Sequence, residues 1–259
     1  MRLRTDNLSV SYGGLVAVSD VSLGVGPGEL VGLIGPNGAG KTTTIDAMSG
    51  FTPHRGRVEL DGADISTLPA HVRARSGLAR TWQSIELFED LTVRQHCSVA
   101  AQRTGPADLV LDLFRPRRAR SDTVVDEALD LLGLSDVADE LPGALPHGRQ
   151  KLLGVARALA ARPSALLLDE PAAGLDSGES MSFGRRLREL VDGGLAILLI
   201  DHDTQMVLEF CDRIYVLDFG AVIATGTPAE IRDDPRVVEA YLGVGSHRPP
   251  APPAQEVGG

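Results

Sequence analysis

Apolar and polar positions alternate in short blocks at the start of the chain. Residues 8–14, 15–25 and 26–34 each contain a short apolar run bounded by glycine or polar turn residues, a pattern typical of β-strands. Residues 57–65 add a strand pair around Asp61-Gly62, a dipeptide that favours a hairpin turn. The pattern therefore predicts strands over most of the first 65 residues.

The pattern changes to helical spacing from Thr92 to about Leu134. Apolar residues follow this spacing at Val124, Val125, Ala128, Leu129, Leu131 and Leu132. From Gly148 helices and strands alternate, with predicted helices over residues 150–162, 179–191 and 204–211 and predicted strands over residues 165–170, 195–200, 213–218 and 221–226. Such alternation favours an α/β fold with a mostly parallel sheet covered by helices on both faces.

A glycine-rich loop lies between the third predicted strand and the helix that follows it. Residues 32–45 read GLIGPNGAGKTTTI, which matches G-x-x-x-x-G-K-[ST] with strand, loop and helix in the required order. Glycines turn backbone N–H groups inward, and the helix N-terminus adds partial positive charge, so the loop can hold phosphate oxygens. We expect Lys41 to reach the β- and γ-phosphates and Thr42 to bind Mg²⁺. The residues predicted to contact the nucleotide here are Gly35, Pro36, Asn37, Gly38, Ala39, Gly40, Lys41, Thr42 and Thr43.

The composition supports this interpretation and excludes other classes. Lysine occurs only at Lys41 and Lys151, whereas arginine occurs 23 times, so lysine is kept where a slim point charge is needed. The net charge of −10 argues against general nucleic-acid binding. Cys97 and Cys211 stand far apart, which suits a reducing cytosol and excludes a cysteine metal site. No run of 18 apolar residues and no apolar signal core are present, so we expect a chain that neither spans nor crosses a membrane.

Two carboxylates follow the apolar run ALLL at residues 165–168. Ionised carboxylates at the end of a buried strand are costly unless they have partners. A Mg²⁺ ion bound by Asp169 would be such a partner, and Glu170 would act as a base by accepting a proton from the attacking water. In the plainer alternative, both residues only cap the next turn. His202 follows the next strand at the same sheet edge, where it could hold the γ-phosphate and the attacking water.

The remaining charged and titratable features carry weaker predictions. Four arginines, Arg115, Arg117, Arg118 and Arg120, lie between the predicted helices; we interpret them mainly as a solvated connection, with an acidic partner or lipid headgroups as the alternative. The histidines His54, His71, His96 and His247 form no recognisable cluster, so we expect them at the surface.

The order of these motifs resembles the ATP-binding subunit of an ABC transporter over roughly residues 1–243. The resemblance rests on the phosphate loop, RTWQ at residues 80–83, LPHGRQ at 145–150, ALLLDEP at 165–171, GLD at 174–176 and DHD at 201–203. It implies a P-loop core, an N-terminal antiparallel β-subdomain (both within 1–85 and 150–243) and an inserted helical subdomain at 86–149, with residues 244–259 as a disordered proline-rich tail. It also implies that Tyr12 stacks on adenine. Gln83 would bind Mg²⁺, sense the γ-phosphate and link to the membrane subunit. Gly148 would open a helix that contacts ATP bound to the opposite subunit, and Asp176 would communicate across the dimer.

Longer stretches are similar to the branched-chain amino-acid importer ATPases, some relatives of which serve urea or short amides. The implied partners are transmembrane permease subunits, a second ATP-binding subunit (a second copy or a sibling) and an extracytoplasmic solute-binding protein, with this chain on the cytoplasmic face of the membrane. The alternatives are an exporter or lipid-extraction ATPase and a non-transport ABC ATPase. Two positions depart from the family: Trp82 replaces phenylalanine, and Pro146-His147 replace serine and glycine. Pro146 offers no hydroxyl or N–H, so we expect slower ATP turnover.

Overall fold

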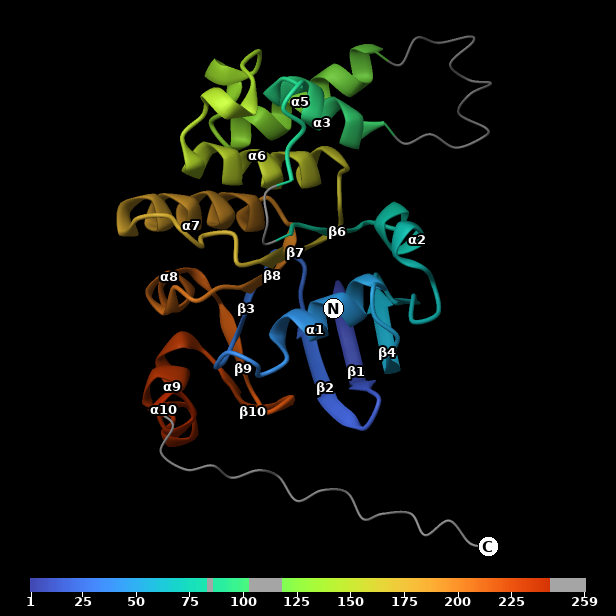
Figure 1. The fold of residues 1–259 in the computed structure, drawn as a ribbon, viewed down its shortest axis with the longest axis vertical. Coiled ribbons are helices and arrows are strands. Elements are labelled where there is room, and N and C mark those ends of the chain that lie inside the picture. The colour runs from blue at the N-terminus through green and yellow to red at the C-terminus, as the bar shows by residue number, and fades with distance from the viewer. Residues whose placement is uncertain (83–85, 103–117, 243–259) are drawn as a thin grey trace, which may run out of the picture.

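Two sheets form the centre of the protein. The computed structural model describes residues 1–82, 86–102 and 118–242 (Figure 1). One sheet is antiparallel with strand order β2-β1-β4-β5. Its strands are β1 (Leu3–Tyr12), β2 (Leu15–Val25), β4 (Arg55–Leu60) and β5 (Ala63–Asp64). The predicted hairpin at Asp61-Gly62 joins β4 to β5, which are paired antiparallel.

The second sheet has six strands in the order β10-β9-β3-β8-β7-β6. The strands are β3 (Leu30–Ile34), β6 (Leu78–Arg80), β7 (Ala165–Asp169), β8 (Ala196–Ile200), β9 (Arg213–Asp218) and β10 (Ala221–Gly226). All neighbours are parallel except β9 and β10. The predicted α/β class with a mostly parallel sheet and an N-terminal antiparallel sheet is therefore confirmed.

Helices surround the parallel sheet and form a group at one end of the molecule. The α-helices are α1 (Lys41–Ser49), α2 (Ala70–Arg75), α3 (Val93–Ala101), α5 (Arg118–Leu131), α6 (His147–Ala160), α7 (Ser177–Asp192), α8 (Thr204–Phe210), α9 (Pro228–Asp233) and α10 (Pro235–Leu242), with single 3₁₀ turns at η1 (Ser135–Val137) and η2 (Pro142–Ala144). Helices α3, α5 and α6 lie together at the top of Figure 1. Helix α6 runs across the predicted subdomain boundary at residues 149/150, and the boundaries themselves stay a prediction.

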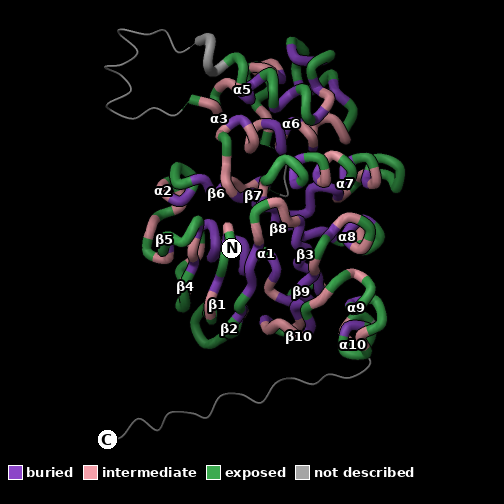
Figure 2. Tube along the Cα trace, turned by 180° about the vertical axis from the view of Figure 1, so that it is seen from behind, coloured by how far each residue is buried: buried purple, intermediate pink, exposed green. Residues whose placement is uncertain are grey.

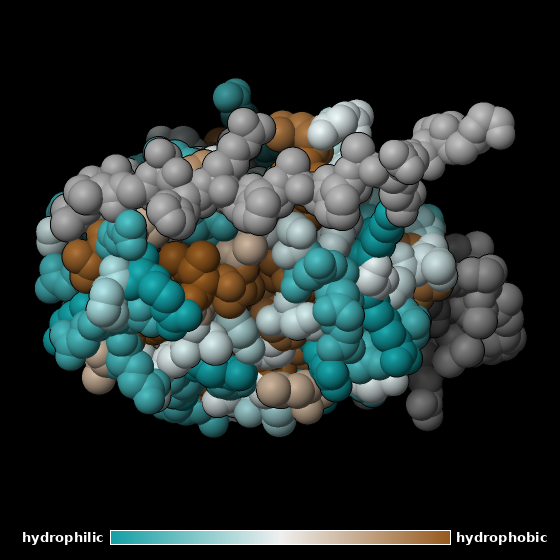
Figure 3. Space-filling view, turned by 90° about the horizontal axis from the view of Figure 1, so that it is seen from below, coloured by the Kyte–Doolittle hydropathy of each residue, from teal (hydrophilic) through white to brown (hydrophobic). Residues whose placement is uncertain are grey.

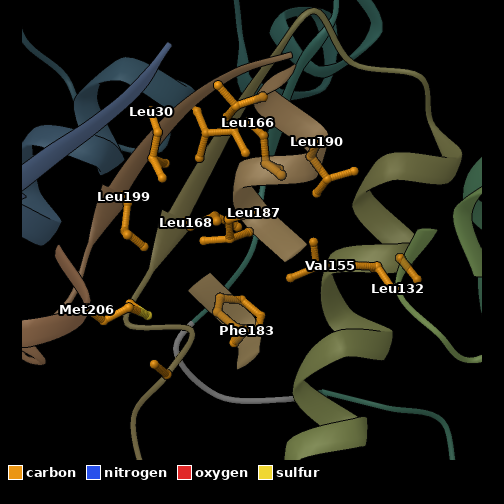
Figure 4. Close-up of a cluster of buried hydrophobic side chains, with 14 of the residues drawn as sticks. Leu30, Leu132, Val155, Leu166, Leu168, Phe183, Leu187, Leu190, Leu199 and Met206 are labelled. Carbon is orange, nitrogen blue, oxygen red and sulfur yellow. The ribbon is translucent and has the colours of Figure 1, made fainter. Parts of the chain in front are cut away.

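The central strands are buried along their whole length, as Figure 2 shows. Successive strand residues point to opposite faces, so one strand contributes to two cores. Leu166 and Leu168 pack with Leu187 and Val155 on the side of α6 and α7 (Figure 4). Leu167 packs on the other face in a cluster that includes Ile45 of α1. This double burial explains why the strand sequences are continuous apolar runs.

One prediction about histidines is wrong. His96 is buried on α3, where its Nε2 accepts a hydrogen bond from the N–H of Phe88 (2.9 Å) and its Nδ1 lies 2.8 Å from the carbonyl of Thr92. A buried imidazole is stable there because both ring nitrogens have partners. His54 is half-buried, and His71 is exposed as predicted.

Several predictions fall on residues outside the described part of the chain. These are Gln83, His247, Arg115, Arg117 and the tail at residues 244–259. Arg118 and Arg120 begin α5. Among the described residues, no helix is long and apolar enough to cross a bilayer.

Candidate functional site

The phosphate loop connects β3 to α1 and is fixed by close backbone contacts. Gly35, Gly38 and Gly40 have φ values of 149°, 81° and 100°, which disfavour residues with side chains. A Cβ at Gly40 would lie 2.7 Å from the carbonyl oxygen of Ala17 in β2. On the other side, the N–H of Gly220 donates to the carbonyl of Ala39 at 3.0 Å. The glycines therefore let the loop pass between two neighbouring segments.

Lys41 begins α1 and lies under this loop. Its Nζ donates to the carbonyls of Gly35 (2.7 Å) and Pro36 (3.0 Å). Burial lowers the pKa of the Lys41 ammonium, and the charges of Glu170 and Asp169 oppose that shift. These two carboxylates, more than a hundred residues away in sequence, are therefore close enough to the lysine to act on it.

The rest of the loop offers groups to solvent. Asn37, Gly38 and Thr42 are exposed, and Thr43 is half-buried. The free backbone N–H groups at the start of α1 lie at the same place, because a helix leaves its first N–H groups without helical partners. The loop thus combines one buried cation with exposed polar groups, as a phosphate site requires.

Asp169 ends β7 with one oxygen paired and one free. Its Oδ2 accepts from Nη2 of Arg80 at 3.1 Å, while its buried Oδ1 has no hydrogen-bond partner among the described residues. Burial raises the pKa of the Asp169 carboxyl, and Arg80 opposes that shift. A buried carboxylate oxygen without a partner is costly, and a cation is the kind of ligand that would satisfy it.

These oxygen donors fit Mg²⁺. The free Oδ1 of Asp169 and the exposed hydroxyl of Thr42 are the hard ligands this ion prefers. Within the described residues, no group of three His, Cys, Asp or Glu side chains is placed to hold a metal.

Glu170 and His202 meet at the carboxyl edge of the sheet. Nε2 of His202 lies 2.5 Å from Oε1 of Glu170, and the Glu170 side chain is 9% exposed while that of His202 is 50% exposed. Glu170 has φ 50°, and its N–H donates to the carbonyl of Ile200 at 2.8 Å. A non-glycine residue at positive φ is uncommon, and this backbone bond to β8 holds it there.

Asp201 was missed by the sequence analysis, although it lies next to His202. Its buried carboxylate accepts from the N–H of Ala172 (3.0 Å) and from the N–H of Asp203 (2.9 Å). It therefore ties the loop after β7, which carries Glu170, to the loop after β8. Its position directly after the apolar strand β8 was the available signal.

The residues assigned through the family resemblance lie at three other places. Tyr12 ends β1, is 52% exposed, and has its hydroxyl 3.4 Å from Oγ1 of Thr52. Gly148 is the second residue of α6, and a Cβ there would lie 3.0 Å from a carboxylate oxygen of Glu179. Asp176 caps α7 by accepting from the N–H of Glu179 at 2.8 Å. The start of α6 and the start of α7 are thus adjacent.

One face of the molecule is mostly polar with apolar patches. Figure 3 shows this for the molecule viewed from below. In the β1–β2 hairpin the exposed apolar residues are Tyr12, Leu15 and Val16. Next to α1, the rings of Phe51 and Trp82 are also exposed and meet edge to face with centroids 4.8 Å apart.

A glycine loop after β3, carboxylates after β7 and a histidine after β8 are the parts of a P-loop nucleotide hydrolase. Residues 18–173 match the family described as ABC transporter, and residues 221–247 match the family described as branched-chain amino acid ATP-binding cassette transporter. The chain belongs to the ABC transporter family, as one of its ATP-binding, ATP-hydrolysing subunits.

Similar proteins fall into two groups by name. The chain is 39% identical over 248 residues to the high-affinity branched-chain amino acid transport ATP-binding protein BraF of Pseudomonas aeruginosa, covering 93% of this chain and 97% of the relative. It is 38% identical over 243 residues to the lipopolysaccharide export system ATP-binding protein LptB of Haemophilus influenzae, with the same coverage. The solved ADP conformation of MJ1267, an ATP-binding cassette of an ABC transporter, matches with TM-score 0.82 and 30% identity over 93% of this chain and 98% of that one.

Proposed function

We propose that this chain powers an importer of branched-chain amino acids. The observation that carries the proposal is the match of residues 221–247 to the branched-chain transporter family, added to the 39% identity with BraF. The matched segment includes β10, α9 and α10. Burial raises the pKa of the Tyr241 phenol on α10, and the backbone of Gly35 in the phosphate loop opposes that shift. The segment typical of that subfamily therefore lies near the phosphate loop.

In the proposed mechanism, this chain's residues hold ATP and activate water. Lys41 and the loop amides neutralise the phosphates, and Tyr12 contacts adenine. Thr42, Asp169 and Gln83 would hold Mg²⁺, which would supply positive charge to stabilise the transferred phosphoryl group. Glu170 takes the proton from the attacking water. The imidazole of His202, 2.5 Å from the Glu170 carboxylate, holds the γ-phosphate and that water.

We further propose that two ATP-binding subunits act together. With one phosphate loop in this chain, each site would borrow the start of α6 from the opposite subunit, including Gly148, and Asp176 would act across that interface. The subunits would lie on the cytoplasmic face of the membrane against permease subunits, supplied by an extracytoplasmic solute-binding protein. The core (1–85 and 150–243) would carry the chemistry, and the helical subdomain at 86–149 would carry the borrowed signature.

Transport in reconstituted vesicles tests the proposal. The chain is assembled with transmembrane permease subunits, and uptake of radiolabelled leucine is compared with that of urea. ATP-dependent leucine uptake is expected, and Gln83→Ala should reduce it more than it reduces ATP hydrolysis by the isolated subunit. If the vesicles take up urea but not leucine, urea replaces branched-chain amino acids as the proposed solute. If Gln83→Ala reduces transport and ATP hydrolysis equally, Gln83 does not link hydrolysis to the permease.

The second candidate is lipid extraction, favoured by the 38% identity to LptB. It predicts ATP-dependent release of a lipid from the same vesicles and no solute uptake. A lipid-release assay on the assembled complex distinguishes the two functions directly.

A further inference from the structure

Arg80 is the last residue of β6 and is almost completely buried, with 5% of its side chain exposed. It contacts three separate parts of the protein. Nη1 donates to Asp46 (2.5 Å) and to Ser49 (3.1 Å), both on α1. Nη2 donates to Asp169 (3.1 Å) at the end of β7. One guanidinium therefore joins the phosphate-loop helix to the carboxylate proposed to hold Mg²⁺.

The flat face of the same guanidinium contacts an aromatic pair. The Arg80 Cζ lies 4.1 Å from the ring centroid of Trp82 and 5.9 Å from that of Phe51. Cation–π contacts at these distances are attractive, and arginine can stack on a ring while its edge donates hydrogen bonds. Both rings are about half exposed: Phe51 is 56% and Trp82 43% exposed. The Arg80 guanidinium therefore contacts both the buried Asp169 carboxylate and the partly exposed aromatic pair.

The hydrogen bonds of Arg80 leave Asp169 in a defined state. Only Oδ2 is engaged, so Oδ1 stays free and the carboxyl group cannot rotate without breaking the bond to Nη2. A residue that orients a ligating carboxylate in this way commonly tunes metal affinity. The face of the same guanidinium contacts the Trp82 ring. A displacement of Trp82 therefore changes the geometry at Asp169, and a displacement of Asp169 changes the contact with Trp82.

We infer that Arg80 is a positioning residue that couples the Asp169 carboxylate to the exposed Phe51–Trp82 pair. Because one guanidinium contacts both ends, a change at Asp169 alters the contact with Trp82, and a change at Trp82 alters the orientation of the Asp169 carboxylate. The inference rests on the proposed role of Asp169 in binding Mg²⁺, and it does not depend on the transported solute.

Trp82 is the single tryptophan of the chain, so its fluorescence reports this contact directly. The full-length subunit is titrated with a non-hydrolysable ATP analogue in the presence of Mg²⁺ and, separately, of EDTA. We expect a change in Trp82 emission that requires Mg²⁺. Arg80→Lys keeps the charge and loses the planar fork, so it should still bind the analogue while losing most of that change. The Mg²⁺ concentration for half-maximal hydrolysis should rise about 10- to 100-fold.

Arg188→Lys is the matched control, because Arg188 also pairs with two carboxylates, Asp192 and Asp212, and lies on α7. It should leave both the emission change and the Mg²⁺ dependence as in the parent. A second variant, Trp82→Ala, tests the coupling from the surface end: the Mg²⁺ dependence should shift while the KM for ATP stays within about threefold.

An Arg80→Lys protein that folds and keeps the full Mg²⁺-dependent emission change would overturn the inference. So would a parental protein whose emission ignores Mg²⁺, or a Trp82→Ala protein with parental Mg²⁺ dependence. Asp169→Asn distinguishes failure of the Arg80 inference from failure of the proposed Mg²⁺ site. If Asp169→Asn leaves the Mg²⁺ dependence of hydrolysis unchanged, the assignment of Asp169 as a Mg²⁺ ligand is wrong. If Arg80→Lys does not fold, the Trp82→Ala result decides.

Discussion

Replacing Asp201 by alanine removes the carboxylate that joins the loops carrying Glu170 and His202. Two backbone N–H groups, of Ala172 and Asp203, would lose their acceptor. Hydrogen bonds to a charged group contribute about 1.5–3 kcal/mol each, so the gross loss is about 3–6 kcal/mol. The carboxylate is buried, which raises its pKa and shows that ionisation there carries a desolvation cost. Removing that cost offsets part of the loss, and we expect about 2–4 kcal/mol of net destabilisation.

Urea unfolding followed by circular dichroism measures this value, and the melting temperature should fall by about 4–16 °C. ATP hydrolysis at a temperature where the variant is folded should also fall, because the two loops are no longer tied together. Asp192→Ala is the control: its carboxylate pairs with Arg188 on an exposed surface, so it should cost less than about 1 kcal/mol. If Asp201→Ala and Asp192→Ala destabilise equally, the buried carboxylate does not tie the loops and the reasoning is wrong.

Three further predictions follow from the site and the core. Glu170→Gln should lower ATP hydrolysis by roughly 10²–10⁴-fold while an ATP-bound dimer accumulates on size-exclusion chromatography with Mg-ATP; hydrolysis at the parental rate would remove Glu170 as the base. Pro146→Ser places a favourable capping residue before α6, so phosphate release should be unchanged or modestly faster and stability should rise by about 0.5–2 kcal/mol; loss of activity would show that the proline shapes the signature. Burial raises the pKa of the Cys97 and Cys211 thiols to about 12. Above about pH 9 these thiols ionise in the unfolded chain but not in the folded protein, so each thiol should lower the free energy of unfolding by about 1.4 kcal/mol per pH unit as pH rises towards 12. Urea midpoints at pH 8 and 10 check this, and a Cys97→Ala protein with the same pH dependence as the parent would contradict it.

The sequence determined the features that depend on local pattern and spacing. The phosphate loop is recognisable because glycine spacing, Lys41 and Thr42 must occur together in one short segment. Strands β3, β7 and β8 are recognisable because burial on both faces demands continuous apolar runs. The order of such segments along the chain was enough to predict an α/β fold and the ABC transporter family, and both predictions were confirmed.

Only the tertiary structure decided which segments are neighbours. Strand β8 lies between β3 and β7 although it follows both in sequence, and this order brings His202 against Glu170. Arg80 meets Asp169 across 89 residues of sequence, and His96 is buried because Phe88 and Thr92 satisfy its ring. Side-chain periodicity tells which face of an element is buried, but not which element covers it. That choice is made by long-range packing and hydrogen bonding, which no local pattern records.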